Sequence, residues 1–209
     1  MDSENIEKVP MGDSPKKLKK FLLFAWEIAK IAIVAFIIVA PIRYFLFQPF
    51  IVSGTSMDPT FATGDYLIID EISYRFSELQ RGDIVVFNAG FIPGFTKQRF
   101  IKRVIGLPGE TVIITNGQVQ IIKDGKTLIL DENYLPDGLK TYGYNGSDLS
   151  LLPEEITLQN NQYFVLGDNR AQSYDSRYWG VVNRNEIIGK AAVRVLPITS
   201  LSEIPRPTY

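Results

Sequence analysis

The hydrophobic pattern of the chain begins with one long apolar run. Residues 21–42 read FLLFAWEIAKIAIVAFIIVAPI, and only Glu27 and Lys30 interrupt the apolar positions. About 20 apolar residues are enough for an α-helix to cross a bilayer. Charges three positions apart share one face of a helix, so Glu27 and Lys30 can pair. The run therefore predicts a transmembrane helix.

The sequence before this run predicts its orientation. Residues 1–20 are polar and end in a lysine cluster, which favours a cytoplasmic N-terminus and an extracytoplasmic remainder. A cleavable signal peptide and a buried helix of a soluble protein are the two alternatives to an anchor. The signal peptide is disfavoured because the run is long and no clean A-x-A site follows it.

From Arg43 onward the pattern changes to that of β-strands. Short runs rich in Ile, Val, Phe and Tyr alternate with Gly, Pro, Asn and Asp, and no second long helical pattern follows. Asn116-Gly117 separates two such runs, which is typical of a two-residue hairpin, and Asp124-Gly125 indicates another turn. The predicted strands include 66–72, 84–88, 98–105, 110–115, 162–167 and 187–196.

These elements predict a mainly β fold, in which a twisted, mostly antiparallel sheet follows one N-terminal transmembrane helix. The stretch 123–160 carries three lysines against seven acidic residues, which favours a smaller, solvated inserted lobe. We therefore divide the chain into a tail (1–20), an anchor (21–42) and an extracytoplasmic β domain (43–209) that contains this lobe.

Composition then narrows the chemistry. The 209 residues carry a net charge of −1 and include no His and no Cys. A Ser-His-Asp triad, a thiol nucleophile, a disulfide and zinc sites built from His or Cys are excluded. The near-neutral charge offers no broad basic field for nucleic acid. We expect no cofactor, no metal and no nucleic-acid partner, and proton transfer must use Lys, Asp, Glu or Tyr.

Without histidine, a serine hydroxyl can still be activated by a neutral lysine. Ser56 lies in VSGTSMDPT (52–60), where Gly54 permits an unusual backbone angle and Pro59 argues against a helix interior. Such a bend can present a hydroxyl beside free backbone N–H groups. On local chemistry alone, however, a serine in a Gly/Pro loop is more typical of a turn.

Lys102 is the candidate base. Strand alternation places it with Phe100 and Val104 on one face, and desolvation by such apolar neighbours lowers the pKa of a lysine. The alternative is a strand-edge lysine that extends into solvent. Lys97 and Lys190 are weaker candidates, because the first follows a Pro-Gly loop and the second precedes two alanines in a late strand.

A third polar cluster lies between two glycines in GDNRAQSYDSRYWG (167–180). Its two acids and two arginines can form a buried, hydrogen-bonded clasp, and Ser173 could orient a catalytic amine. The alternative is a polar surface turn with exposed ion pairs of little energetic value. The charged residues of this cluster are Asp168, Arg170, Asp175 and Arg177.

Four motifs in this order, behind an N-terminal anchor, resemble those of bacterial type I signal peptidases. The motifs are SGTSMDPT (53–60), RGDIVVF (81–87), KRVIGLPGE (102–110) and GDNRAQSYDSRYWG (167–180), and the layout covers nearly the whole chain. Members of this family are membrane-bound serine endopeptidases that remove signal peptides from exported preproteins. The resemblance therefore implies preproteins and the phospholipid bilayer as partners, and the cell membrane as the location.

The resemblance also implies a role for each site residue. Ser56 would be the nucleophile and Lys102 the general base, with Ser173 orienting the lysine. Asp175 and Arg177 would form a structural ion pair, and Asp168 would support the same loop. The family cuts after small residues in an A-x-A-like pattern, and the shallow P1 and P3 pockets would be lined by Val52, Met57, Phe61, Phe100 and Ile101.

Two positions depart from the family pattern. Gly54 stands where some members have a serine whose hydroxyl helps to bind the oxyanion, and Ala171-Gln172 stands where the last motif usually has Asp-Asn. Three further functions are compatible with parts of the pattern. They are a self-cleaving Ser-Lys domain of the repressor type, disfavoured by the anchor, a membrane-anchored β binding module, and an inactive homologue.

Overall fold

The computed structural model describes residues 15–45, 47–143, 155–204 and 206–209. The chain divides into two compact units, residues 1–43 and 44–209. In the first unit, helix α1 (Pro15–Phe45) contains a segment, Lys19–Val39, that is long and apolar enough to cross a membrane, with a mean hydropathy of 2.4. Lys30 Nζ lies 2.7 Å from Glu27 Oε1, so the two charges of the apolar run do pair.

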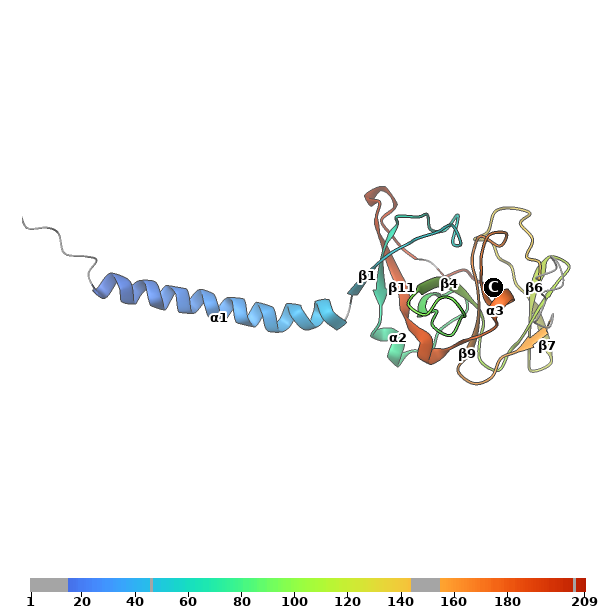
Figure 1. Ribbon diagram of the computed structural model, residues 1–209, viewed down its shortest axis with the longest axis horizontal. Helices are drawn as coiled ribbons and strands as arrows, with labels where there is room; N and C mark the ends of the chain where they lie inside the picture. Colours follow the sequence, from blue (N-terminus) through green and yellow to red (C-terminus); the bar gives the residue numbers. More distant parts are fainter. Residues whose placement is uncertain (1–14, 46, 144–154, 205) are drawn as a thin grey trace, which may run out of the picture. The chain divides into compact units, whose positions relative to one another are not determined.

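The second unit is built on an eight-stranded antiparallel sheet with the order β1-β2-β11-β3-β4-β9-β10, and β12 pairs with β11. Figure 1 shows β1 and α2 at one end of this unit and β6 and β7 at the other. The strands are β1 (Phe47–Ile51), β2 (Tyr66–Asp70), β3 (Ile84–Asn88), β4 (Arg99–Gly106), β9 (Gln162–Leu166), β10 (Val182–Asn183), β11 (Ile187–Leu196) and β12 (Ser202–Glu203).

A second, four-stranded antiparallel sheet has the order β7-β6-β5-β8. Its strands are β5 (Thr111–Thr115), β6 (Gln118–Lys123), β7 (Lys126–Ile129) and β8 (Glu155–Thr157). The β5–β6 turn has φ of 53° at Asn116 and 79° at Gly117, and the β6–β7 turn has 49° at Asp124 and 73° at Gly125. The predicted hairpin at Asn116-Gly117 and the predicted turn at Asp124-Gly125 are both confirmed. These residue types tolerate positive φ at both central positions.

The stretch 123–160 supplies β7 and β8 to this second sheet, while its residues 144–154 lie outside the described part of the chain. The remaining helical elements are short: α2 (Ser73–Phe76), α3 (Ser176–Trp179) and the 3-10 turns Arg184–Glu186 and Ile198–Ser200. The prediction of a mainly β, antiparallel fold behind one apolar helix is confirmed.

The two sheets pack closely at the end of β4. A Cβ atom at Gly106 would lie 2.5 Å from Val112 Cγ2 and 2.7 Å from Leu158 Cδ1, so only glycine fits there. Around it, Ile105 and Phe164 of the large sheet join Val112 of the small sheet in one buried cluster. β4 is thus held between its two sheet neighbours and the second sheet, which makes it a rigid base for side chains on its surface.

Candidate active site

The loop between β1 and β2 presents Ser56. Its ends are closed by hydrogen bonds from Val52 N to Asp65 O and from Gly64 N to Val52 O, both 2.9 Å. Gly54 has φ of 95°, a region that side chains rarely adopt, and it turns the loop just before the serine. Ser56 is half-buried at the resulting bend, and its N–H donates to no oxygen among the described residues.

Lys102, in the middle of β4, contacts the serine directly. Its Nζ donates to Ser56 Oγ at 2.7 Å and to the carbonyl oxygen of Ile101 at 2.9 Å. The residue is 4% exposed, and this burial lowers the pKa of its amine from 10.5 to about 8, against the opposing field of Asp175 and Asp168. Burial disfavours the ammonium form, so neutral lysine becomes accessible near neutral pH.

Ser173 lies buried next to the loop that carries Ser56. A Cβ atom at Gly167 would overlap both the Ser173 hydroxyl and the Ser56 carbonyl oxygen, so glycine allows these two residues to approach each other. The Ser173 Oγ has no hydrogen-bond partner among the described residues. The structure thus brings Ser173 beside the loop that carries Ser56, and the Ser173 hydroxyl donates no hydrogen bond to Lys102 and accepts none from it.

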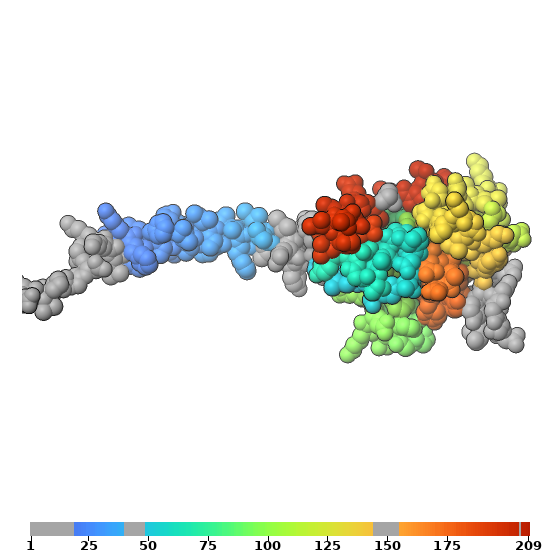
Figure 2. All heavy atoms as spheres, turned by 90° about the horizontal axis from the view of Figure 1, so that it is seen from above, coloured from blue at the N-terminus to red at the C-terminus, as the bar shows by residue number. Residues whose placement is uncertain are grey.

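Asp168 joins three segments of the site. Its carboxylate accepts from Arg103 Nε at 2.8 Å and from Arg103 Nη2 at 2.6 Å, and from Thr60 Oγ1 at 2.5 Å. Asn169 N donates to Ser56 O at 3.1 Å, which ties the loop that carries Asp168 to Ser56. Figure 2 shows the cyan segment after β1 beside the orange segment after β9. A bidentate, charge-assisted pair of this kind fixes geometry as well as adding energy.

Asp175 and Arg177 form the second ion pair, with Arg177 Nε 2.8 Å from Asp175 Oδ1. The other oxygen of Asp175 accepts from Gly167 N at 3.0 Å, and Arg177 Nη2 donates to Arg170 O at 2.8 Å. Asp175 also caps α3. The structure therefore gathers all four charged residues of 167–180 into one hydrogen-bonded loop.

The sequence did not predict that Glu132 and Tyr134 contact the arginines of the site. Arg170 Nη1 and Nη2 donate to the Glu132 carboxylate at 2.7 and 2.6 Å, and the Tyr134 ring lies 4.0 Å from the Arg103 guanidinium carbon. These contacts join residues some 30 to 40 positions apart, and no periodicity or motif within 123–160 signals them. Glu132 and Tyr134 of the stretch 123–160 therefore stabilise the site, in addition to any solvated surface that this stretch forms.

The structure separates the five apolar residues predicted to line the substrate pockets. Val52, Met57, Phe61 and Ile101 belong to one buried cluster. Phe100 packs instead against a different cluster, which includes Val85, Phe87 and Val104. Consecutive residues of a strand point to opposite faces, which explains why Phe100 and Ile101 belong to different clusters.

Comparisons with known proteins identify the family of the chain. The family model described as "Signal peptidase, peptidase S26" matches residues 25–196. The chain belongs to this signal peptidase family. It is 41% identical over 175 residues to a probable signal peptidase I-2 of Synechocystis, a match that covers 82% of this chain and 73% of the relative.

A second relative and one solved structure are also signal peptidases I. A signal peptidase I of Bacillus amyloliquefaciens is 34% identical over 191 residues, covering 91% of this chain and 95% of the relative. Among solved structures, a signal peptidase I from Enterococcus faecalis V583 is 31% identical, with a TM-score of 0.43, and covers 56% of this chain and 98% of its own.

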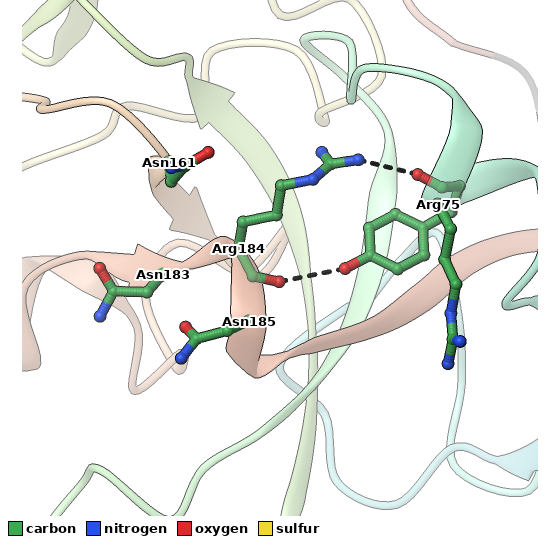
Figure 3. Close-up of a pocket in the computed structure, with 6 residues that line it drawn as sticks. Arg75, Asn161, Asn183, Arg184 and Asn185 are labelled. Carbon is green, nitrogen blue, oxygen red and sulfur yellow. Dashed lines mark hydrogen bonds between the residues drawn. The ribbon is translucent and has the colours of Figure 1, made fainter.

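An open pocket of about 620 Å³ lies elsewhere in the second unit, lined by Tyr74, Arg75, Asn161, Asn183, Arg184 and Asn185 (Figure 3). Arg184 Nη2 donates to the carbonyl oxygens of Tyr74 and Ser77 at 2.9 Å each, and the Tyr74 hydroxyl donates back to Arg184 O at 3.0 Å. Arg184 thus fastens α2 to the start of β11, and neither Ser56 nor Lys102 lines this pocket.

Asp168→Asn tests whether the buried pair with Arg103 holds the site together. The substitution leaves the buried guanidinium without its counter-charge, a change that typically costs about 3–5 kcal/mol. We expect a clearly lower thermal unfolding midpoint for the full chain in detergent. The matched control is Asp124→Asn, at an exposed turn whose positive φ asparagine tolerates, and it should change stability by less than about 0.5 kcal/mol. Equal midpoints for the two variants would contradict the role assigned to Asp168.

Proposed function

We propose that Ser56 and Lys102 carry out the serine endopeptidase reaction of signal peptidase I, the cleavage of signal peptides from preproteins. The observation that carries the proposal is the 2.7 Å hydrogen bond between the buried Lys102 amine and the Ser56 hydroxyl. The names of the relatives, which are 34–41% identical over most of the chain, support the same activity.

In the proposed reaction, neutral Lys102 accepts the proton of Ser56 as Oγ attacks the scissile carbonyl. The resulting ammonium then gives this proton to the leaving amine, and the acyl group stays on Ser56 as an ester. Water hydrolyses the ester with Lys102 again acting as the base. At the lowered pKa of about 8, about one lysine in ten is neutral at pH 7, against one in about 10³ to 10⁴ at the ordinary pKa.

Two further groups support the dyad in this proposal. The free N–H of Ser56 donates to the developing oxyanion, the position where a preorganised donor has its largest effect. The unused hydroxyl of Ser173 accepts an N–H of the Lys102 amine once the substrate is bound, and so directs the amine lone pair at Ser56. Asp168, Asp175 and Arg177 hold the loop that carries Ser173.

The proposed specificity for small residues follows from packing. Val52, Met57, Phe61 and Ile101 are at most 5% exposed, so a pocket opened between them accommodates only a short side chain.

In this proposal, Lys19–Val39 anchors the enzyme in the cell membrane. The lysines before this segment favour a cytoplasmic N-terminus and an extracytoplasmic catalytic unit. An anchored enzyme meets membrane-inserted signal peptides at a raised effective concentration.

Lys102→Met should abolish cleavage of a preprotein with an A-x-A site, measured with the full chain in detergent by gel and mass spectrometry. Methionine keeps the bulk but cannot accept a proton, so we expect a loss of at least about 10³-fold. Ser56→Ala should lose as much, and the double variant no more, because the two groups act as a unit. Lys126→Met, at an exposed strand position, is the control and should stay within about twofold of the unchanged chain. Cleavage by Ser56→Ala at the full rate would favour a binding module or a different nucleophile.

The pH profile should follow the neutral fraction of Lys102. Because the active form is the deprotonated amine, kcat/KM should rise about tenfold per pH unit below the pKa of about 8 and level off above it. The measurement is kcat/KM from pH 5.5 to 9.5 with a peptide whose chemical step is shown to limit the rate. A flat profile over this range would exclude lysine as the base.

A further inference from the structure

Four aromatic rings form a continuous series beside the dyad. The ring centroids of Phe100 and Phe95 are 5.1 Å apart, those of Phe95 and Tyr174 are 5.7 Å apart, and those of Tyr174 and Tyr178 are 5.1 Å apart. We name these four residues the aromatic ridge. Tyr174 and Tyr178 are 41% and 39% exposed, so the ridge runs from the half-buried Phe100 to the surface.

The aromatic ridge meets the catalytic residues at two points. The Lys102 Nζ lies 5.4 Å from the centre of the Phe100 ring. Tyr174 directly follows Ser173, which is buried beside Gly167 and the Ser56 carbonyl. A peptide held at Ser56 Oγ therefore reaches the ridge within its next few residues, since an extended chain advances about 3.3 Å per residue.

Hydrogen bonds hold the two backbone segments that carry Phe95 and Tyr174 of the ridge. The loop between β3 and β4 is closed by hydrogen bonds from Ala89 N to Gln98 O at 2.9 Å and from Gln98 N to Phe95 O at 3.0 Å. Tyr174 directly precedes Asp175, whose carboxylate is held by Arg177 and Gly167. A ligand that binds to segments whose backbone is already ordered has less conformational entropy to lose.

The position of Lys102 shows which part of a substrate faces the ridge. The amine that leaves in the proposed reaction must come within hydrogen-bond reach of Lys102 Nζ to receive its proton. Phe100 and Lys102 share one face of β4, whereas Ile101, a proposed wall of the P1 pocket, points to the opposite face. The ridge therefore lies on the side of the leaving amine.

We propose that the aromatic ridge binds the first residues of the mature protein, those just after the scissile bond, and prefers apolar and aromatic side chains there. Such side chains bury apolar area against the exposed faces of Tyr174 and Tyr178, whereas glycine gains nothing. The ridge would thus make the enzyme selective for the sequence on both sides of the cut. This inference rests on the proposed roles of Ser56 and Lys102.

The test uses a set of preproteins that are identical up to the cleavage site. One carries only glycine and serine at the first three mature positions, and three others carry a single phenylalanine at the first, second or third of them. For the full chain in detergent, we expect kcat/KM to be on the order of tenfold higher for at least one phenylalanine substrate. In Tyr174→Ala and in Tyr178→Ala this ratio should fall below about twofold.

The ratio of two substrates on one enzyme does not change when a variant merely contains less folded protein. Phe76→Ala, in α2, removes a more exposed aromatic ring (87%) that is not part of the ridge, and it should keep the full ratio. Equal kcat/KM for all four substrates would overturn the ridge proposal and leave the Ser56–Lys102 reaction standing. No cleavage of any substrate would overturn both.

Exposed aromatic rings can also bind a lipid surface, which is the alternative ligand of the ridge. If Tyr174→Ala kept the substrate ratio but bound phosphatidylglycerol vesicles less tightly than Phe76→Ala, the ridge would contact lipid and the substrate proposal would be wrong. If its vesicle binding were unchanged and its substrate ratio collapsed, the assignment to the mature end of the preprotein would be supported.

Discussion

The burial of the Lys102 amine against the Ser56 hydroxyl is the constraint on which the rest of the site depends. A buried lysine normally keeps its proton if a carboxylate pairs with it. Among the described residues no carboxylate lies within ion-pair distance of Lys102, although Asp168 and Asp175 are near enough to raise its pKa. Each of these acids is instead held by an arginine of its own. The arginines therefore have a chemical consequence as well as a structural one, because they engage the negative charges that would otherwise keep the amine protonated.

One strand organises most of this arrangement. β4 directs Lys102 toward Ser56 and the adjacent Arg103 toward Asp168, so a single rigid element positions both the proposed base and the loop that carries Asp168. Gly167 completes the fit, because any side chain at this position would push Ser173 and the Ser56 carbonyl apart. The site is thus assembled from three segments distant in sequence, each fixed by contacts with the other two.

The turns and strands that depend on residues close together in the sequence could be predicted from it. The hairpin at Asn116-Gly117 and most strand bounds followed from local turn chemistry and β-rich runs. The strand β1 was missed, because Pro49 interrupts its pattern, and proline is tolerated there only because β1 is an edge strand. Local chemistry alone left Ser56 as a turn residue, and only the order of four motifs pointed to a dyad. The contact between Arg170 and Glu132 could not be predicted, since nothing in either segment indicates which partner it meets in the fold.

The most direct test of this account is an NMR titration of Lys102 itself. The full chain, labelled with ¹³Cε-lysine and held in detergent micelles, would be titrated from pH 6 to 12, and the signal missing from Lys102→Met identifies the resonance. The account predicts a midpoint at about 8, set by burial beside Ser56. A midpoint at the ordinary lysine value of 10.5 would contradict it, because the amine would then be charged at neutral pH and could not serve as the proposed base there.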